Sequence, residues 1–451
     1  MSDTIAAVAT GAQVCAIGIV RLSGERAIEL ADALFRPQNG KPMSSAAPRT
    51  LVYGELHDRS DALLDLCLCT VSRAPHSYTG EDTAEFQCHG SPVVLRTLLD
   101  ELFALGARQA LPGEFTKRAF LNGRLALSSA EAVADIIDAE SAESAKNAAG
   151  QLAGALSRRT AGLYDALADI SAHYHAVLDY PDEDIEPFEL ERYESTLRSA
   201  RDALVSLLAT YERGKLMSGG IPAAIIGRPN AGKSSLLNAL LGYERAIVTR
   251  VPGTTRDTIE EKLKLGAVTL RLIDTAGLRE TADEVERLGV ERSRRAMESA
   301  ELILAVIDGS EPLTAEDEEI LAAAARARHA LVVLSKKDLH ETPAVKTALP
   351  VVSVSSLTGE GMAQLEQAIE AMFPLPDVPA GGILTNARHA EAIGRALEYL
   401  DAALHAMSDG ATPDIVLTES EGAMAAIGEL DGRTVREDVT ARIFSRFCVG
   451  K

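Results

Sequence analysis

The spacing of apolar residues divides the chain into segments of different character. Up to about residue 120, short apolar runs alternate with Gly and Pro, and a helical stretch follows the last of them at 91–107. The clearest runs lie at 15–22, 50–56, 65–71 and 83–90. Runs of this length bounded by turn residues predict β-strands, so we expect an α+β unit at the amino terminus.

From Ser128 to residue 179 the sequence is rich in alanine and free of proline. Ser128 and Glu131 have the spacing of a capping box, which predicts one or two long helices beginning there. Pro181 lies in an acidic stretch that ends them, and the pattern predicts a further helix over 191–214, up to Gly214.

Residues 221–373 alternate apolar strand-like runs with helical stretches, which predicts a doubly wound, mostly parallel sheet with crossover helices. After a Pro/Gly-rich stretch, the pattern again predicts helices, at 386–407, 419–432 and 435–447. We expect the helical segments on both sides to pack together. The fold class is then multidomain α/β plus all-α, with the α/β domain inserted in a helical domain.

Composition and charge limit the cellular setting. The 451 residues suggest two to four domains, and the net charge of −21 excludes a surface that binds polyanions everywhere. The first 24 residues lack a basic, continuously apolar signal, and no later run is long enough to span a bilayer. The odd number of cysteines, without CxxC spacing, predicts a reduced cytoplasmic protein. They are Cys15, Cys67, Cys69, Cys88 and Cys448.

The segment Gly227–Ser234 reads GRPNAGKS, follows a predicted strand and opens a predicted helix. This pattern is typical of a P-loop: glycine turns let backbone N–H groups surround phosphate oxygens, Lys233 neutralises the β and γ charge, and Ser234 can bind Mg²⁺. Asp274 to Gly277 (DTAG) follow another predicted strand. The Asp274 carboxylate can hold Mg²⁺ through a water molecule, and the Gly277 N–H can donate to the γ-phosphate. Thr255, beside Thr254, is the expected second hydroxyl ligand of Mg²⁺.

Lys336 and Asp338 end a predicted strand where guanine-nucleotide proteins carry Asn-Lys-x-Asp. The Asp338 carboxylate can accept hydrogen bonds from guanine N1 and N2, which adenine cannot supply, so the sequence favours GTP. Ser335 replaces the Asn, and we expect one polar contact there to be shortened or lost. Leu278 stands where many GTPases have a Gln that orients the attacking water, and an apolar side chain cannot do this. The acidic run 283–286 could supply the group that orients the water, or it could be the solvated start of a helix.

Together these motifs resemble the MnmE (TrmE) family of tRNA-modification GTPases over nearly the whole chain. The resemblance rests on RLSG, SYTGED, EFQCHG, PGEFTKRAFLNGR, GRPNAGKSSLLNALL, GTTRDTIEE, DTAGLRETADEVERLGVERS and the terminal CVGK. It implies four parts: 1–122, which binds tetrahydrofolate and dimerises; 123–215, the first helical part; 216–376, the GTPase domain; and 377–451, the second helical part.

The resemblance implies a GTP site, a K⁺ site and a catalytic residue. Expected K⁺ ligands are Asn230, Thr249, Val251 and Thr254, and Glu286 would orient the attacking water; Arg256 and Arg279 remain rival arginine fingers. The full set of expected GTP contacts is Asn230, Ala231, Gly232, Lys233, Ser234, Ser235, Thr249, Arg250, Val251, Pro252, Gly253, Thr254, Thr255, Asp274, Thr275, Ala276, Gly277, Lys336, Asp338, Ser355, Ser356 and Leu357.

The implied activity is modification of the wobble uridine (U34) of certain tRNAs at C5 by a homodimer, with an FAD-dependent partner of the MnmG (GidA) type in a heterotetramer. A 5-formyl-tetrahydrofolate or related folate would bind at Arg21, Glu85, Arg124 and Lys451; Arg124 replaces the family's more common Lys. Cys448 is a candidate functional thiol. Since the sequence has no GxGxxG, the redox cofactor is expected on the partner.

Two other functions remain open from the residues. A ribosome-assembly or RNA-binding switch GTPase would fit the P-loop segment equally well, but would have no use for a folate pocket in the first 125 residues. A folate-dependent one-carbon transferase with a regulatory GTPase domain differs only in its partner.

Overall fold

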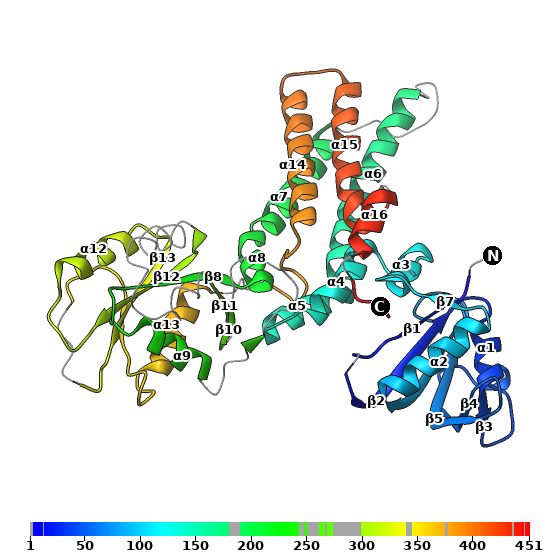
Figure 1. Ribbon diagram of the computed structural model, residues 1–451. Coiled ribbons are helices and arrows are strands. Elements are labelled where there is room, and N and C mark those ends of the chain that lie inside the picture. Colours follow the sequence, from blue (N-terminus) through cyan, green and yellow to red (C-terminus); the bar gives the residue numbers. More distant parts are fainter. Residues whose placement is uncertain are drawn as a thin grey trace. The chain divides into compact units, whose positions relative to one another are not determined.

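We describe the protein from a computed structural model (Figure 1). The structure describes residues 3–11, 13–179, 190–242, 248–249, 261–266, 268–273, 299–339, 345–374, 378–434, 437–445 and 447–451. The chain forms two compact units. Unit 1 comprises Met1–Ala134, Leu152–Asp179 and Glu421–Lys451, and unit 2 comprises Asp135–Gln151 and Tyr180–Ser420.

Unit 1 contains a seven-stranded sheet within the described residues, in the order β3-β4-β5-β6-β2-β1-β7. All neighbours are antiparallel except β1 and β7. Its elements are β1 (Ile5–Val8), β2 (Cys15–Ser23), α1 (Ala27–Leu34), β3 (Phe35–Pro37), the 3₁₀ turn η1 (Met43–Ser45), β4 (Val52–His57), β5 (Leu63–Ser72), β6 (Thr83–Gly90), α2 (Pro92–Ala104) and β7 (Arg108–Gln109). The four predicted strands correspond to β2, β4, β5 and β6, so the α+β prediction is confirmed.

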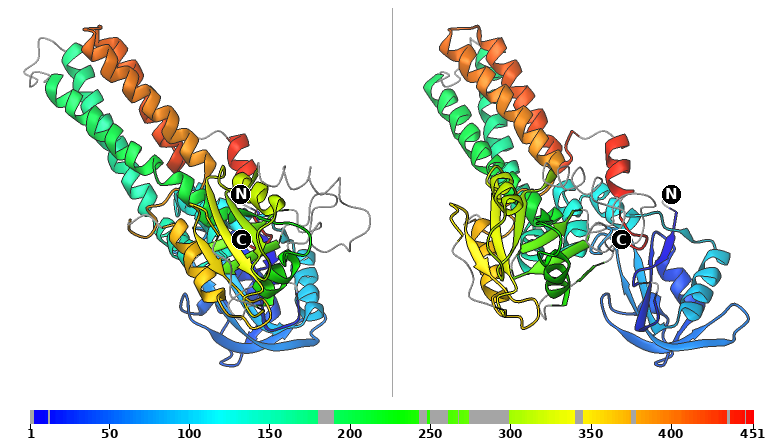
Figure 2. Two further views of the ribbon diagram at one scale, coloured as in Figure 1. Left: turned by 90° about the vertical axis from the view of Figure 1, so that its left-hand side faces the viewer. Right: turned by 60° about the vertical axis from the view of Figure 1, so that its left-hand side comes forward.

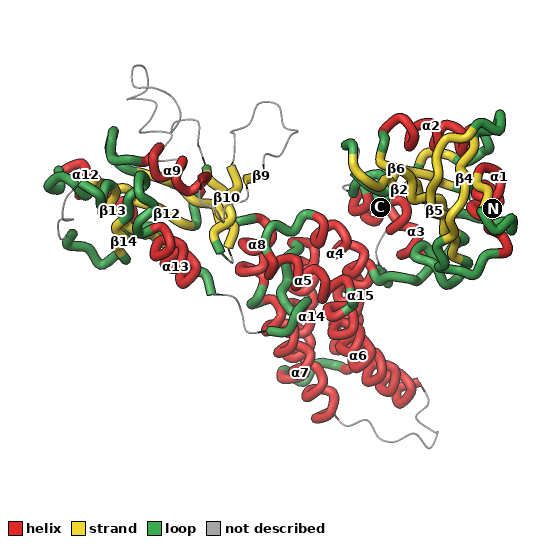
Figure 3. The backbone as a smooth tube through the Cα atoms, turned by 90° about the horizontal axis from the view of Figure 1, so that it is seen from below, coloured by secondary structure: helices red, strands yellow, loops and turns green. Residues whose placement is uncertain are grey.

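Helices α1 and α2 cover one face of this sheet (Figure 3). Leu30 and Leu34 of α1 and Leu98 and Leu102 of α2 are buried against the sheet. The same face carries the thiols of Cys67, Cys69 and Cys88, which are buried and free. The opposite face keeps alternate side chains of β2, β5 and β6 partly accessible, as period-two strands covered on one side require.

The rest of unit 1 is helical and includes the chain's last residues. The elements are α3 (Glu114–Leu121), α4 (Leu127–Ile137), α6 (Ala155–Asp179), the last turns of α15 (Pro413–Asp431) and α16 (Glu437–Phe444). Phe444 and Phe447 pack against Leu127 and Val133 of α4. Asp431 accepts hydrogen bonds from Ser128 (3.3 Å) and Thr160 (3.2 Å), which joins α15 to α4 and α6.

The expected capping box at Ser128 and the expected number of helices are wrong. Ser128 lies inside α4 and is buried, and its hydroxyl donates to Asp431. Three helices replace the expected one or two: α4, α5 (Ala142–Leu152) and α6. Ser141 accepts from the N–H of Ser144 (3.1 Å) just before α5, and Gly154, with φ +84°, separates α5 from α6.

Unit 2 contains the second seven-stranded sheet within the described residues, in the order β14-β13-β12-β8-β11-β10-β9. β14, β13, β12, β8 and β11 are parallel, whereas β10 and β9 are antiparallel at the edge. The elements are β8 (Ile221–Ile226), α9 (Lys233–Gly242), β9 (Val248–Thr249), β10 (Glu261–Leu265), β11 (Val268–Leu272), β12 (Leu302–Asp308), α12 (Ala315–Ala324), β13 (His329–Ser335), β14 (Val351–Ser353) and α13 (Met362–Met372).

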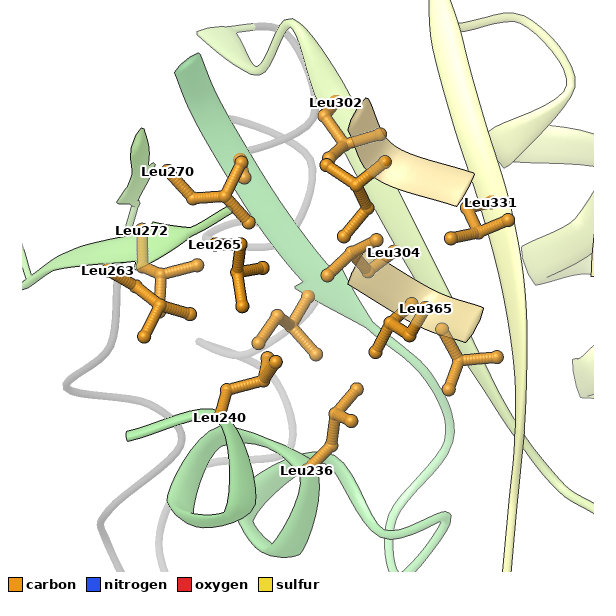
Figure 4. Close-up of a cluster of buried hydrophobic side chains, with 14 of the residues drawn as sticks. Leu236, Leu240, Leu263, Leu265, Leu270, Leu272, Leu302, Leu304, Leu331 and Leu365 are labelled. Carbon is orange, nitrogen blue, oxygen red and sulfur yellow. The ribbon is translucent and has the colours of Figure 1, made fainter. Parts of the chain in front are cut away.

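Helices cover both faces of this sheet. Leu236 and Leu240 of α9 and Leu365 of α13 pack on one face against leucines of β10, β11, β12 and β13 (Figure 4). On the other face, Ile320 and Ala324 of α12 pack against β12 and β13. Because β12 is buried at every position, its apolar run is continuous rather than alternating, as in a parallel sheet covered on both sides. The doubly wound prediction is confirmed.

Helices before and after this sheet in the sequence pack together within unit 2. They are α7 (Leu190–Leu208) and α8 (Tyr211–Gly219) before it, and α14 (Ala387–Ser408) and the first turns of α15 after it. α7 lies beside α14 (Figure 2), with Arg201 2.5 Å from Asp401. The buried Tyr193 hydroxyl donates to Ser420 (2.7 Å). The α/β part is therefore inserted in helical sequence, as predicted.

The predicted helix over 191–214 is in fact two helices, and its predicted end at Gly214 is wrong. Thr210 interrupts the helix because its hydroxyl donates to the Leu207 carbonyl (2.7 Å) and accepts from the Leu384 N–H (3.0 Å). Gly214 lies inside α8, where a Cβ would lie 1.8 Å from the Leu384 carbonyl oxygen. This glycine permits close backbone approach instead of ending a helix.

Candidate functional site

The loop between β8 and α9 carries the P-loop motif. A Cβ at Gly227 would lie 2.4 Å from the Val306 carbonyl oxygen, so only glycine fits against β12. Asn230 and Gly232 have φ values of +62° and +96°, in the left-handed region. The loop therefore turns tightly before α9 begins at Lys233, and the first N–H groups of α9 have no partner within their own helix. A helix N-terminus of this kind favours an anion.

Lys233 lies over the loop. Its ammonium donates to the carbonyl oxygens of Gly227 and Arg228, each at 2.8 Å. Burial lowers the pKa of the Lys233 side chain below its usual value. Among the described residues, the contacts given for this cation are to neutral carbonyls, so phosphate oxygens can supply its counter-charge.

Ser335 ends β13 and contacts the P-loop. It is buried, and its hydroxyl donates to the Ala231 carbonyl at 2.6 Å and lies 3.2 Å from the Ile307 carbonyl. A Cβ on Gly232 would lie 3.3 Å from the Ser335 Cβ, so the two segments are close enough for one hydroxyl to bridge them. The hydroxyl that stands in place of the usual Asn amide therefore still reaches the P-loop.

Asp338 and Lys336 follow in the loop after β13. The Asp338 carboxylate accepts from the Ser355 hydroxyl at 2.6 Å, which joins this loop to the one that follows β14. The Lys336 ammonium lies 2.6 Å from the buried Asp308. Burial by itself raises the pKa of Asp308, but hydrogen bonds from Lys336 and Ser310 outweigh it, so the net pKa is lowered. Of the predicted loop 355–357, Ser355 is buried and Leu357 is 85% exposed.

The remaining predicted GTP contacts divide into two groups. Ser234 and Ser235 lie in the first turn of α9, and Thr249 ends β9, opposite Lys262 of β10. The rest lie outside the described residues, as does the predicted catalytic residue Glu286: Arg250, Val251, Pro252, Gly253, Thr254, Thr255, Asp274, Thr275, Ala276 and Gly277. The structure thus brings together the P-loop and the base-side loops.

The predicted folate residues lie in unit 1. Arg21 of β2 is opposite Glu85 of β6 in the antiparallel register, and its Nε is 2.6 Å from the Glu85 carboxylate. The guanidinium also lies 5.8 Å from the Tyr78 ring centre and 5.7 Å from that of Phe115. Both charged side chains are about one quarter exposed, at 22% and 27%. The pair is half-buried beside two aromatic rings.

The carboxyl terminus and Arg124 come to the same region. The backbone N–H of Phe115 donates to the Lys451 carboxyl end at 3.2 Å, and the N–H of Gly113 donates to the Cys448 carbonyl at 3.2 Å. The Cys448 residue is exposed. Arg124 donates from Nε to the Ser77 carbonyl at 3.2 Å, next to Tyr78. Arg21 and Lys451 therefore contact Tyr78 or Phe115 directly, Glu85 is joined to them through Arg21, and Arg124 bonds Ser77, the residue before Tyr78.

Sequence reasoning missed the charged network beneath this region. Arg118, which is buried, contacts Glu81 (2.8 Å), Glu114 (3.0 Å) and Asp3 (2.7 Å). Glu114 also lies 2.6 Å from Arg108. Burial by itself raises the pKa of Glu114, but hydrogen bonds from Arg108, the Leu111 N–H and Arg118 outweigh it and lower the pKa. The sequence signal that could have predicted this network is the charged residues within the motifs SYTGED and PGEFTKRAFLNGR.

Those two strings, SYTGED and PGEFTKRAFLNGR, contact one another directly. The Tyr78 hydroxyl is 3.0 Å from the Thr116 hydroxyl, and the Asn122 amide donates to the Thr79 carbonyl at 2.7 Å. Burial raises the pKa of Tyr78, so its phenol stays protonated at neutral pH. The motifs therefore hold β6, its preceding loop and α3 together around the Arg21–Glu85 pair.

The described residues contain neither a metal-binding cluster nor a membrane-spanning helix. No set of three His, Cys, Asp or Glu side chains among them is arranged to hold a metal ion. Among the helices that the structure describes, none has both the length and the apolarity needed to cross a membrane.

Comparison with known proteins places the chain in a family. The family model described as "GTP-binding protein TrmE N-terminus" matches residues 4–124, and the "MnmE helical domain" matches residues 127–448. The tRNA modification GTPase MnmE of Heliobacterium modesticaldum is 43% identical over 100% of both chains. That of Roseiflexus sp. is 42% identical over 100% of this chain and 99% of its own.

Among solved structures, the G domain of the T. maritima FeoB iron transporter is similar at 25% identity, with a TM-score of 0.26, over 34% of this chain and 98% of that chain. The two family models together extend over residues 4–448, and the full-length relatives are well above 30% identical. The chain belongs to the MnmE (TrmE) family of GTP-binding proteins.

Proposed function

We propose that this chain is a potassium-stimulated GTPase that modifies tRNA. With an FAD-dependent partner of the MnmG type, it would install an aminomethyl-type group at C5 of the wobble uridine of certain tRNAs, using a tetrahydrofolate one-carbon donor. The observation that carries the proposal is the full-length similarity to proteins named tRNA modification GTPase. Free thiols at all five cysteines support a reducing compartment, and we propose the cytoplasm.

GTP is the nucleotide that the described residues suit. A Cβ at Gly227 would collide with the Val306 carbonyl, Gly232 has a φ of +96°, and Lys233 donates to neutral carbonyls. These features support phosphate binding, and the fixed Asp338 carboxylate supports recognition of guanine N–H groups. When bound, Mg²⁺ would neutralise phosphate charge, with Ser234 and Thr255 as its ligands.

The groups proposed for the hydrolytic step lie partly outside the described residues. We propose that K⁺ binds Asn230, Thr249, Val251 and Thr254 and that Glu286 orients the attacking water. The left-handed backbone of Asn230 places it within the P-loop turn, which supports its role as a ligand close to the phosphates.

For the folate, an anionic tail suits the cations of Arg21, Arg124 and Lys451, and pterin N–H groups suit the Glu85 carboxylate. Tyr78 and Phe115 beside Arg21 offer aromatic surface for a planar ring. The contact of the carboxyl-terminal tail with Phe115 supports a role for Cys448 at this site, as wall or nucleophile. We also propose that the chain acts as a homodimer with domains at 1–122, 123–215, 216–376 and 377–451.

The proposal is tested by nucleoside analysis of tRNA from a deletion strain. We expect loss of the C5 substituent at the wobble uridine, with restoration by the wild type and by Arg96→Ala, an exposed control on α2. Lys233→Ala and Glu85→Ala should each fail to restore it. If the substituent persists in the deletion strain while ribosomal subunits accumulate abnormally, the ribosome-assembly alternative is right.

A further inference from the structure

Ser335 is the polar side chain through which the end of β13 meets the P-loop. It is 1% exposed, and its hydroxyl lies 2.6 Å from the Ala231 carbonyl. A hydroxyl has one proton to donate, and the shorter of its two carbonyl contacts takes it. A Cβ at Gly232 would lie 3.2 Å from the Ser335 oxygen, so the two segments are in direct contact. The hydroxyl proton of Ser335 is therefore used by the P-loop.

The donors that follow Ser335 are also committed elsewhere. Lys336, with φ +58°, directs its ammonium to Asp308 at 2.6 Å. Lys337 lies 2.8 Å from Glu360 at the surface. In Asp338, Oδ1 accepts from Ser355 at 2.6 Å, and the carboxylate can accept further hydrogen bonds. The segment 335–338 therefore offers a base an acceptor, and none of its donor side chains is held ready for the base.

We propose that Ser335 is a positioning residue: it fixes the P-loop for phosphate binding and does not read the base, whose recognition by this segment rests on Asp338. The proposal depends on the guanine pocket proposed above. An acceptor selects the N1–H and N2–H₂ groups of guanine, whereas the ring acceptor N7 receives no side-chain donor from residues 335–338. Ser335 then affects every nucleotide that uses the P-loop equally.

Base analogues on the wild-type, full-length protein give the first test. The affinities are measured by competition against a fluorescent GDP derivative. 7-deaza-GTP, which lacks the N7 acceptor, should bind with the same affinity as GTP within about twofold. Inosine triphosphate, which lacks the N2 donors, should bind at least about tenfold more weakly. A 7-deaza-GTP affinity about tenfold below that of GTP would overturn the proposal. Equal affinity for ATP and GTP would instead show that the guanine pocket itself is wrong.

Removing the hydroxyl gives the second test. Ser335→Ala should weaken GTP, 7-deaza-GTP and inosine triphosphate binding by the same factor, about tenfold, because the P-loop loses the bond that holds the Ala231 carbonyl and must be ordered by the phosphates on binding. The ratio of GTP to inosine triphosphate affinity should not change. Asp338→Asn should change that ratio and admit xanthosine triphosphate, and the double variant should show the product of the two effects.

A changed ratio in Ser335→Ala, or unchanged affinity for all three nucleotides, would overturn the role of Ser335. If that variant does not fold, the analogue series on the wild type still decides, because it needs no substitution. A role in folding alone would lower the thermal midpoint without altering the affinity of the folded fraction.

Discussion

Arg118 offers a quantitative test of the charged network around α3. Its guanidinium donates to Glu81 (2.8 Å), to the Asp3 carbonyl (2.9 Å) and carboxylate (2.7 Å), and to Glu114 (3.0 Å). The side chains of Arg118, Glu81 and Glu114 are only 10%, 16% and 11% exposed. Replacing Arg118 by alanine removes the cation and leaves the buried carboxylates of Glu81 and Glu114 without the positive charge that they share.

The size of the effect follows from what each carboxylate keeps. Removing one partner of a buried ion pair costs about 3–5 kcal/mol. Glu114 retains Arg108 (2.6 Å) and the Leu111 N–H (2.8 Å), and Glu81 retains the Ser23 hydroxyl (2.7 Å). Asp3, at 56% exposure, adds little. The lower end, about 3 kcal/mol, is therefore expected, which corresponds to roughly a 100-fold change in the opening equilibrium.

Amide hydrogen exchange of the full-length protein measures the opening equilibrium residue by residue, so unfolding of other parts of the chain does not affect the values for α3 and β6. Protection in α3 and β6 should fall about 100-fold in Arg118→Ala. Arg96→Ala, the same substitution at an exposed position of α2, should leave protection unchanged within about threefold. If Arg118→Ala changes protection no more than Arg96→Ala does, the desolvation cost of the network cancels its attraction and the reasoning is refuted.

Glu85→Ala should abolish calorimetric binding of 5-formyl-tetrahydrofolate while GTP hydrolysis continues, and unchanged folate affinity would exclude the proposed folate site. Hydrolysis should rise strongly when KCl replaces NaCl at equal ionic strength, and Glu286→Ala should stop hydrolysis but not GTP binding. Equal rates in both salts, with Arg256→Ala or Arg279→Ala inactive, would support the arginine-finger alternative. The folded-state pKa values of Asp3 and Glu114 lie below their unfolded values, so their contribution to stability is present above about pH 4.3 and is lost as the pH falls through the folded values. Glu114→Gln should therefore flatten the acid limb of a stability–pH curve, and an identical curve would contradict this assignment.

Periodicity and local motifs were enough to predict the fold class and the order of the strand-rich and helical segments, though not every helix boundary. The buried strand β12 appears as a continuous apolar run, and the strands of unit 1 as short runs between turn residues, because burial imposes these patterns on the sequence itself. The P-loop was equally visible, since Gly227 and Gly232 have the spacing of the motif: a Cβ at Gly227 would collide with the Val306 carbonyl, and Gly232 has a φ of +96°. Features of this kind depend on neighbours within a few residues.

Features that depend on a partner far along the chain were mispredicted or missed. Gly214 was taken as a helix end, yet it lies within α8 because the Leu384 carbonyl approaches it. Ser128 was taken as a cap, yet its hydroxyl bonds Asp431, 303 residues away. Ser335 was expected to leave one polar contact of the guanine motif shortened or lost, and the sequence could not show that its hydroxyl reaches the Ala231 carbonyl. A short polar side chain has several possible partners, and only the tertiary structure decides which one lies within hydrogen-bond distance.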